Sequence, residues 1–290
     1  MAGMAMQVIC QGFLVAQGTT KDDKAKTGQY DKFLSEKFAA DGPGCAALVA
    51  ARGEIIYKKA FGMANLELNV PMHPDMIFRI GSITKQFTAV AVLQLEERGK
   101  LSLQDEITRF IPDYPTMGNK ITVEHLLTHT SGIRSFTDMK EWDDTMRRKD
   151  YMPEDLIHFF KNQPMDFVPG TKFKYNNSGY FLLGYIIEKA SGIPYDQYIR
   201  VNLFIPLGMH HTQFDTTTEI IRNRIPGYTK GEHGYENASY LSMTQPYAAG
   251  SLISTVEDLY TWNKGIRSGK ILKRENLEKA FIPYKLADGT

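Results

Sequence analysis

The sequence predicts an α/β protein of the α+β type, with strands and helices in separate stretches of the chain. The first observation is the order of the elements: one helical segment, two strand-like runs, and then a long section of helical periodicity. The second is an Arg-Gly pair between the two runs, which is typical of an antiparallel hairpin. A doubly wound parallel sheet would alternate strands with helices, so this order excludes it.

The early elements are a helix and a hairpin. Residues 30–39 have helical spacing, with aromatic and leucine side chains on one face. Cys45–Ala51 and Glu54–Gly62 are predicted strands, joined at Arg52-Gly53. A two-stranded sheet is not stable by itself, so a chain of this pattern needs further strands. We predict none between residue 101 and the end of the sequence.

Helix start and stop signals divide the rest of the chain. Ser82 opens a helix that ends before Gly99, a suitable residue to follow a helix. Further helices are predicted after Thr122 as N-cap, from Pro153, from Ser178 to Gly192, from Pro194, and after Ser254 or Thr255 as N-cap.

The composition excludes several classes of protein. The 290 residues include 34 Lys and Arg against 33 Asp and Glu, and 42% are hydrophobic, as in an average globular protein. The formal net charge of +1 lacks the basic excess of nucleic-acid binders, so we expect no nucleic-acid partner. Cys10 and Cys45 cannot by themselves build a disulfide framework or a four-ligand zinc site.

Residues 1–26 differ from the rest. A small, apolar run precedes the charged segment Lys21–Lys26, an order typical of the end of a secretory signal. Gln7 and Gln11 interrupt the run, so a flexible tail is the alternative. We expect a signal remnant or tail over 1–26, one domain over 27–290, and a periplasmic or secreted protein, otherwise a cytoplasmic one. No apolar run reaches the roughly 18 residues of a membrane span, so no transmembrane span is expected.

The sharpest local signal is Ser82-Ile83-Thr84-Lys85 at the start of a predicted helix. Residues three apart project from one helix face, so Ser82 and Lys85 are neighbours. Serine needs a base to become a nucleophile, and a lysine in an apolar site loses its proton readily. The alternative is a serine N-cap followed by an exposed lysine, because this spacing is common by chance.

A second signal is Tyr175-Asn176-Asn177, which follows a Pro-Gly turn and precedes a helix. The phenol of Tyr175 could relay a proton, and the amide of Asn177 could orient a substrate or the lysine. The alternative is a hydrogen-bonded loop tyrosine and an asparagine near a helix start.

The two signals belong to four blocks in a fixed order: the Ser82 motif, HLLTHTSGI at His125–Ile133, the P-G-T-x-F-x-Y-x-N-x-G-Y block, and AAGSLISTVEDL at Ala248–Leu259. From about Tyr30 to its end the chain resembles the serine β-lactamase and penicillin-binding protein superfamily. The resemblance is greatest to the branch of class C β-lactamases, D-alanyl-D-alanine carboxypeptidases and esterases. It implies an antiparallel sheet flanked by helices plus an all-helical subdomain.

The resemblance also implies a mechanism without a metal or an organic cofactor. Ser82 would be the nucleophile that forms an acyl-enzyme, Lys85 its base and Tyr175 the proton relay to the leaving group. Asn177 would contact the substrate, and the Ser82 backbone N–H would be one oxyanion-hole donor. The substrate would be a β-lactam, a D-Ala-D-Ala-type peptide or a small ester. The alternatives are a non-catalytic penicillin- or peptide-binding homologue and a carboxylesterase of the same fold.

The third motif of the family, K-T-G or H-x-G on a later strand, does not follow Ala248 in this sequence. Three explanations fit: a fragment, a chain completed by a cleaved or separate part, and a degenerate homologue. We favour a fragment that lacks the C-terminal strands, and predict low stability for the isolated 290-residue chain because its hairpin edge stays open.

Two other patterns have ordinary explanations. His125 and His129 lie four apart, as in a metal-binding helix, but no acidic third ligand follows at the H-E-x-x-H spacing, so no metal site is expected. Aromatic residues follow the second block and precede the fourth, and they serve either as the rim of a cleft or as core: Phe136, Trp142, Tyr235, Tyr240 and Tyr247.

Overall fold

The computed structural model describes residues 26–290, so the predicted signal remnant lies almost wholly outside the described residues. The chain divides after Pro74 into two compact units, and each is described by itself. The predicted α+β class is confirmed, since each unit contains both α-helix and small antiparallel sheets. Within residues 26–290, the helices are too short or too polar to cross a bilayer.

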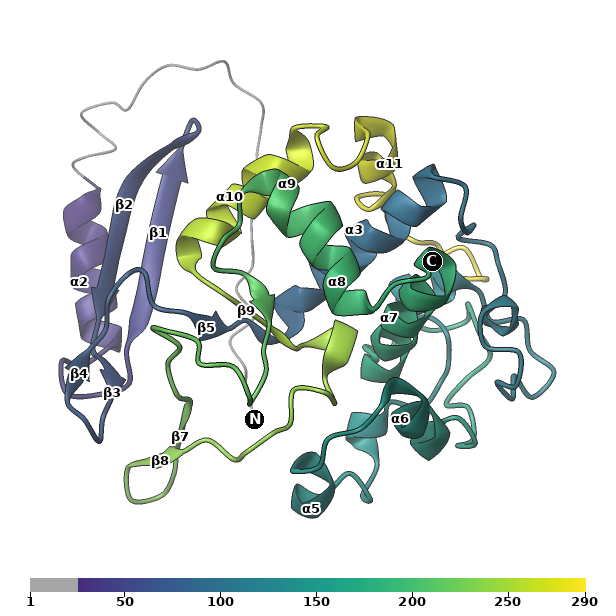
Figure 1. The fold of residues 1–290 in the computed structure, drawn as a ribbon, viewed down its shortest axis with the longest axis horizontal. Helices are drawn as coiled ribbons and strands as arrows, with labels where there is room; N and C mark the ends of the chain where they lie inside the picture. The colour runs from purple at the N-terminus through teal and green to yellow at the C-terminus, as the bar shows by residue number, and fades with distance from the viewer. Residues whose placement is uncertain (1–25) are drawn as a thin grey trace. The chain divides into compact units, whose positions relative to one another are not determined.

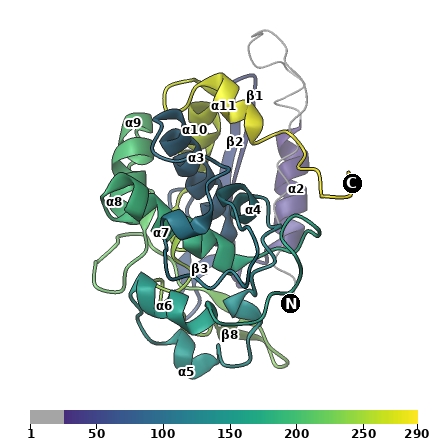
Figure 2. The ribbon, with the colours of Figure 1, turned by 90° about the vertical axis from the view of Figure 1, so that its right-hand side faces the viewer.

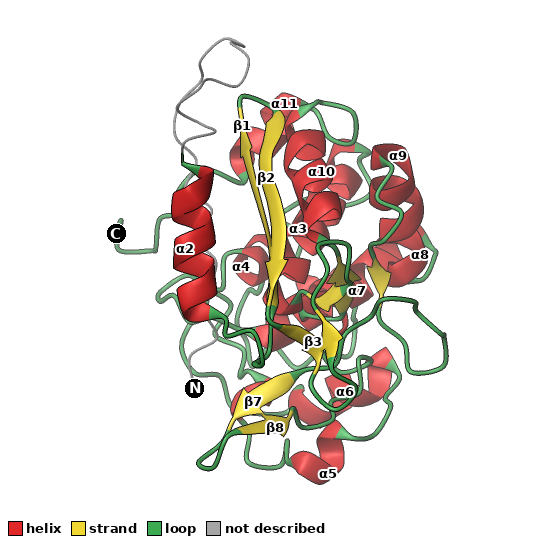
Figure 3. Cartoon of the chain, turned by 90° about the vertical axis from the view of Figure 1, so that its left-hand side faces the viewer, coloured by secondary structure: helices red, strands yellow, loops and turns green. Residues whose placement is uncertain are grey.

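The first unit is a helix beside a hairpin, as predicted (Figure 3). Its elements are α2 (Thr27–Lys37), β1 (Cys45–Ala51), β2 (Glu54–Phe61), β3 (Met63–Asn65) and β4 (Val70–Pro71). Arg52 and Gly53 both have positive φ, the turn geometry that suits the twist of paired strands. Asp31 on α2 holds the helix to β2, because it accepts a hydrogen bond from Tyr57 and pairs with Lys59.

The second unit contains most of the helices (Figures 1 and 2). They are η1 (Gly81–Ile83), α3 (Thr84–Glu97), η2 (Ile107–Arg109), α4 (Val123–Leu127), η3 (Phe136–Asp138), α5 (Asp144–Arg147), α6 (Pro153–Phe160), α7 (Asn177–Ser191), α8 (Tyr195–Ile199), η4 (Arg200–Phe204), α9 (Ile205–Leu207), η5 (Tyr247–Ala249), α10 (Val256–Arg267) and α11 (Arg274–Lys279).

The predicted helix boundaries are correct to within a few residues. Thr122 caps α4, Thr255 caps α10, and Pro153 opens α6. The helix predicted from Ser178 begins one residue earlier, because the side chain of Asn176 accepts from the Gly179 N–H and acts as its N-cap. The helix predicted from Ser82 starts as the 3₁₀ segment η1 and becomes α-helical at Thr84.

Helices α3 and α7 form the centre of the core and set the positions of the site. Both are buried along most of their length, with Phe87 and Ala91 on α3 and Phe181 on α7 without exposed surface. A Cβ atom at Gly184 of α7 would lie 2.4 Å from the ring of Tyr247 in η5. The absence of a side chain at Gly184 therefore allows Tyr247 to pack directly against the backbone of α7. The N-termini of α3 and α7 therefore have fixed places beside η5.

The expectation of no strand after residue 101 is wrong. Four short strands occur there: β6 (Gln213–Phe214), β7 (Tyr228–Lys230), β8 (Tyr235–Asn237) and β9 (Leu252–Ser254). Strand β9 pairs antiparallel with both β5 (Phe78–Arg79) and β6, in the order β5-β9-β6. These strands are too short to show the alternation of apolar and polar residues that indicates a strand. All three residues of β9 are buried, so its sequence has no alternation of this kind either.

Candidate active site

Strand β5 is followed by η1 and then by α3 (Figure 1), and Ser82 lies in η1. Gly81, the first residue of η1, has a φ of +52°, a conformation that glycine adopts without strain. Ser82 is exposed, whereas Lys85, three residues further on the same face, retains only 6% of its surface. The alternative reading of an exposed lysine behind a serine cap is therefore wrong.

The Lys85 amine lies among neutral oxygen atoms. Its Nζ is 2.9 Å from Asn177 Oδ1, 2.8 Å from the carbonyl oxygen of Ala249 and 3.2 Å from Ser82 Oγ. Burial lowers the pKa of Lys85 from its usual value to about 7, because no carboxylate compensates for the lost hydration of the ammonium group. The neutral form of the Lys85 amine is therefore accessible near neutral pH.

Tyr175 contacts both Ser82 and Lys85. Its phenol donates a hydrogen bond to Ser82 Oγ at 2.7 Å, and its ring centroid is 4.7 Å from Lys85 Nζ. Burial raises the pKa of Tyr175, and the hydrogen bond to Ser82 opposes that rise in part. The structure thus brings together all four predicted side chains: Ser82 and Lys85 come from η1 and α3, and Tyr175 and Asn177 come from the segment before α7 and the first residue of that helix.

The imidazole of His129 packs against the ring of Tyr175. Its ring centroid lies 4.7 Å from that of Tyr175 and 5.0 Å from that of Tyr180, and its Nδ1 accepts the Asn176 backbone N–H. Burial and the charge of Lys85 lower the pKa of His129 to about 4, although the hydrogen bond with Asn176 opposes this shift in part, so the imidazole is neutral at pH 7.

The two histidines that lie four apart in the sequence perform separate tasks. His125 Nδ1 accepts the Thr122 N–H in the capping box of α4, whereas His129 Nδ1 accepts the N–H of Asn176. Across residues 26–290, no three side chains of the metal-ligating types come close enough to hold an ion.

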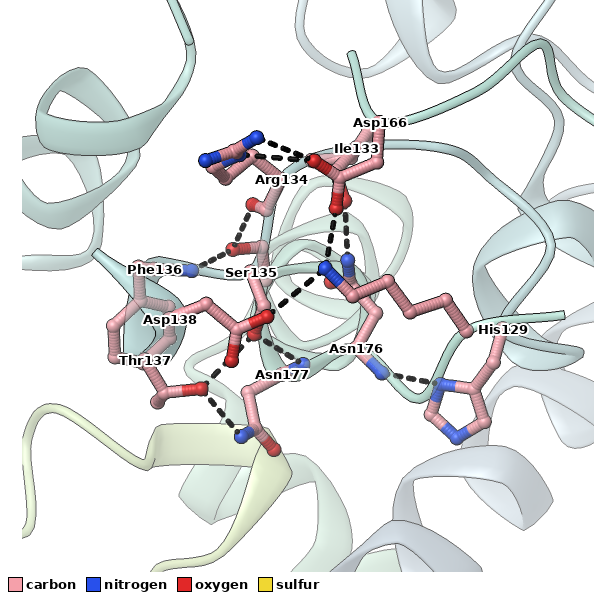
Figure 4. A network of polar contacts seen from close by, with 12 residues as sticks. His129, Ile133, Arg134, Ser135, Phe136, Thr137, Asp138, Asp166, Asn176 and Asn177 are labelled. Atoms are coloured by element: carbon pink, nitrogen blue, oxygen red, sulfur yellow. Dashed lines mark hydrogen bonds and ion pairs between the residues drawn. The ribbon is translucent and has the colours of Figure 1, made fainter. Parts of the chain in front are cut away.

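Helix η3 and the residue before it, Ser135, hold Asn177 in place (Figure 4). Asn177 Nδ2 donates to Thr137 Oγ1 at 3.1 Å, and its backbone N–H donates to Ser135 Oγ at 3.2 Å. In return Ser178 Oγ accepts the Phe136 N–H at 2.8 Å. The amide nitrogen of Asn177 is therefore engaged, which directs its oxygen to Lys85.

A group of ion pairs adjoins η3 (Figure 4), and we call its members Arg134, Asp138, Asp166 and Lys174 the loop clamp. Asp166 pairs with Arg134 at 2.8 Å and with Lys174 at 2.6 Å, and Lys174 also pairs with Asp138 at 3.1 Å. The clamp joins the residues around η3 to the segment that carries Tyr175. Sequence reasoning missed it, because its members lie up to 40 residues apart with no marked spacing.

A cavity of about 360 Å³ opens beside Ser82 and Asn177. Phe136 and Trp142 line it. Phe136 is almost fully buried and belongs to the core as well, whereas the Trp142 side chain is partly exposed and its indole N–H donates a hydrogen bond to Gln245. Tyr247 belongs instead to the core and donates its phenol hydrogen to Glu188. Arg79, Leu241, Met243 and Pro246 also line the cavity, and the sequence carried no signal that singled them out.

Comparisons with known proteins agree with this arrangement. The family model described as beta-lactamase matches residues 30–287. "Putative penicillin-binding protein PbpX" of Bacillus subtilis (strain 168) is 33% identical over 263 residues, which are 90% of this chain and 64% of that protein. Esterase EstB of Burkholderia gladioli is 34% identical over 198 residues, which are 64% of this chain and 50% of EstB.

The fold is also that of solved structures. The octameric penicillin-binding protein homologue from Pyrococcus abyssi superposes with a TM-score of 0.78 at 35% identity, over 89% of this chain and 60% of that one. The chain spans between half and two thirds of the length of these three proteins. Since the family model covers nearly all of the described residues, the predicted resemblance is confirmed and this chain belongs to the beta-lactamase family.

Proposed function

We propose that this protein is a serine hydrolase that transfers acyl groups through Ser82. The observation that carries the proposal is the pair of contacts on Ser82 Oγ, with Lys85 Nζ at 3.2 Å and the Tyr175 phenol at 2.7 Å. A serine becomes nucleophilic when a base lies within hydrogen-bond reach, and Lys85 is such a base at pH 7 because its pKa is about 7.

The surroundings of Lys85 support its role as the base. Asn177 Oδ1 and the Ala249 carbonyl oxygen can only accept hydrogen bonds, so they take the two N–H bonds of a neutral amine. The nitrogen lone pair then points to the third neighbour, Ser82 Oγ. Ser82 can donate its proton to Lys85 while it accepts the hydrogen bond from Tyr175.

The proposed reaction has two steps. In the first, Ser82 Oγ forms a bond to the substrate carbonyl carbon, its proton passes to Lys85, and the Ser82 backbone N–H stabilises the developing oxyanion. The bond to the leaving nitrogen or oxygen then breaks. Tyr175 gives that atom a proton and regains one from Lys85. In the second step a water molecule attacks the acyl carbon, the ester bond to Ser82 breaks, and the serine recovers its proton.

The substrate class is a β-lactam, a D-Ala-D-Ala-type peptide or a small ester. The relatives include a penicillin-binding protein by name and an esterase, which supports both the amide-like and the ester substrates. The alternative function is that of a binding protein that acylates and does not turn over. It differs from a hydrolase only in the fate of the acyl-enzyme.

Intact-mass analysis of the 290-residue chain incubated with benzylpenicillin tests the proposal. We expect an adduct of one penicillin per chain, which is absent from Ser82→Ala. Ser239→Ala is the matched control, since Ser239 lines the same cavity and has no role in the proposed chemistry. An adduct that decays indicates a hydrolase, and one that persists indicates a binding protein.

An ester substrate distinguishes the carboxylesterase alternative from a protein that reacts with β-lactams. Hydrolysis of 4-nitrophenyl pentanoate that depends on Ser82, without any penicillin adduct, would restrict the protein to esters. Folded wild-type chain that reacts with neither substrate, or an adduct that Ser82→Ala also forms, would overturn the proposal.

A further inference from the structure

Among the described residues that line the cavity beside Ser82, one is charged, Arg79. Arg79 ends strand β5 and precedes Ser82 by three residues, so their Cα atoms lie within about 11 Å even if the segment is fully extended. A group attached to an acyl chain on Ser82 can therefore reach the Arg79 side chain.

Arg79 is held by one side of its guanidinium. Its Nε donates to Asp215 Oδ2 at 2.6 Å, while Arg224 donates to Asp215 Oδ1 at 2.6 Å. Asp215 is fully buried, so each of its two oxygen atoms has an arginine partner and the three residues together keep one positive charge. The two terminal nitrogens of Arg79 have no partner among residues 26–290, and its side chain is 43% exposed.

This arrangement is suited to a carboxylate. Two parallel N–H groups of a guanidinium match the two oxygen atoms of a carboxylate, and an arginine already fixed through Nε loses little freedom when it binds one. The register Arg79↔Ile253 with β9 fixes the backbone from which the side chain extends.

The other walls of the cavity strengthen such a contact. Trp142, Leu241, Met243 and Pro246 contribute apolar surface, and no lining residue is acidic. A hydrogen bond between charged groups is stronger where apolar walls exclude water, and no anion of the protein competes for Arg79 from the cavity side.

We propose that Arg79 is a specificity-determining residue that binds a carboxylate on the acyl part of the substrate held at Ser82. The inference rests on the proposed acyl transfer and adds the substrate class: acyl groups with an apolar portion against Trp142 and an anionic end at Arg79. Asp215 and Arg224 position the arginine from behind.

The test compares pairs of substrates that differ by one carboxylate on the acyl side. Carbenicillin carries such a carboxylate and benzylpenicillin does not. The 4-nitrophenyl monoester of glutarate has a carboxylate where 4-nitrophenyl pentanoate has a methyl group. For each pair we define the preference as the ratio of the second-order rate constants for acylation of Ser82, anionic over neutral.

We expect a preference of about tenfold for the wild-type chain, and a preference near one for Arg79→Gln. Arg222→Gln is the matched control, because Arg222 is an exposed arginine that does not line the cavity. The preference should therefore remain in this variant. Arg79→Lys keeps a charge without the paired N–H groups and should give an intermediate ratio.

The wild-type chain alone gives an independent measurement, since a preference that comes from a charge falls as ionic strength rises. A wild-type preference near one, or an equal loss in Arg79→Gln and Arg222→Gln, would overturn the inference while acylation of the neutral substrates still supports the proposed function. If neither member of either pair acylates Ser82 in the wild-type chain, both proposals are wrong.

Discussion

Lys85, which lies against the ring of Tyr175, and Lys174, which precedes Tyr175 in the chain, have opposite electrostatic surroundings. Lys85 is buried against an amide oxygen and a backbone carbonyl, and burial lowers its pKa to about 7. Lys174 is half exposed and bonded to Asp166 and Asp138, and these carboxylates raise its pKa. The type of oxygen atom around each amine, neutral or charged, makes one lysine a candidate base and the other a permanent cation.

The largest expected effect tests whether Lys85 acts by losing its proton. Lys85→Arg keeps a positive charge, but a guanidinium is always protonated in proteins and cannot accept the Ser82 proton. We expect the acylation rate with benzylpenicillin to fall about a hundred- to ten-thousandfold. Lys174→Arg is the control and should stay near the wild-type rate, because it keeps both ion pairs. A Lys85→Arg variant within tenfold of the wild type would contradict the assignment.

A smaller effect is expected when the surroundings of Lys85 are made similar to those of Lys174. The wild-type acylation rate should rise with pH and level off above about 7, as the neutral fraction of Lys85 increases. Asn177→Asp places a carboxylate beside the amine and should raise the pKa of Lys85 by about one to three units. The rate at pH 7 then falls about ten- to a thousandfold, and the inflection moves to higher pH.

The position of the inflection is the decisive readout, since Asn177 is also a proposed substrate contact. Thr137→Val removes the other side-chain partner of Asn177 without adding a charge, so its inflection should remain near pH 7. An Asn177→Asp variant with an unchanged inflection would show that the oxygen at this position does not set the pKa of Lys85.

The smallest effect is expected in the loop clamp. Lys174→Met removes the cation between Asp166 and Asp138, while Arg134 still holds Asp166. We expect the free energy of unfolding to fall by about 1 kcal/mol or less, because the pair is partly exposed. The acylation rate should fall about two- to tenfold, through looser placement of Tyr175, with its inflection still near pH 7.

Lys172→Met is the control for the clamp, as Lys172 is exposed and makes no ion pair within the described part of the chain. Chemical denaturation and the pH dependence of acylation check both variants. A shift of the inflection in Lys174→Met would indicate that the two lysines are not independent.

The sequence predicted the placement of the four site residues because their signals are local. Ser82 and Lys85 share a helix face, and the Pro-Gly turn before Tyr175 precedes a helix with a capped start. The hairpin was predicted for a similar reason, since Arg52-Gly53 adopts the turn that its residues favour. The catalytic roles of these residues remain predictions that the experiments above decide.

The features that sequence reasoning missed depend on distant partners or on main-chain atoms. Arg79 meets Asp215, 136 residues later, only because β9 brings β5 and β6 together. Strand β9 itself has three buried residues and no period. The carbonyl oxygen of Ala249 accepts a hydrogen bond from Lys85. The sequence could not predict this contact, because the acceptor is a main-chain atom that every residue has.

That carbonyl oxygen has a consequence for how the site can change by mutation. Of the two neutral acceptors on Lys85, one belongs to the side chain of Asn177 and the other to the main chain at Ala249. A codon change can replace the first by an acid, a hydrocarbon or nothing, but no codon change removes the second. A single substitution at position 177 can therefore change the basicity of the Lys85 amine. A substitution at position 249 leaves the backbone carbonyl oxygen, and with it this acceptor, in the chain.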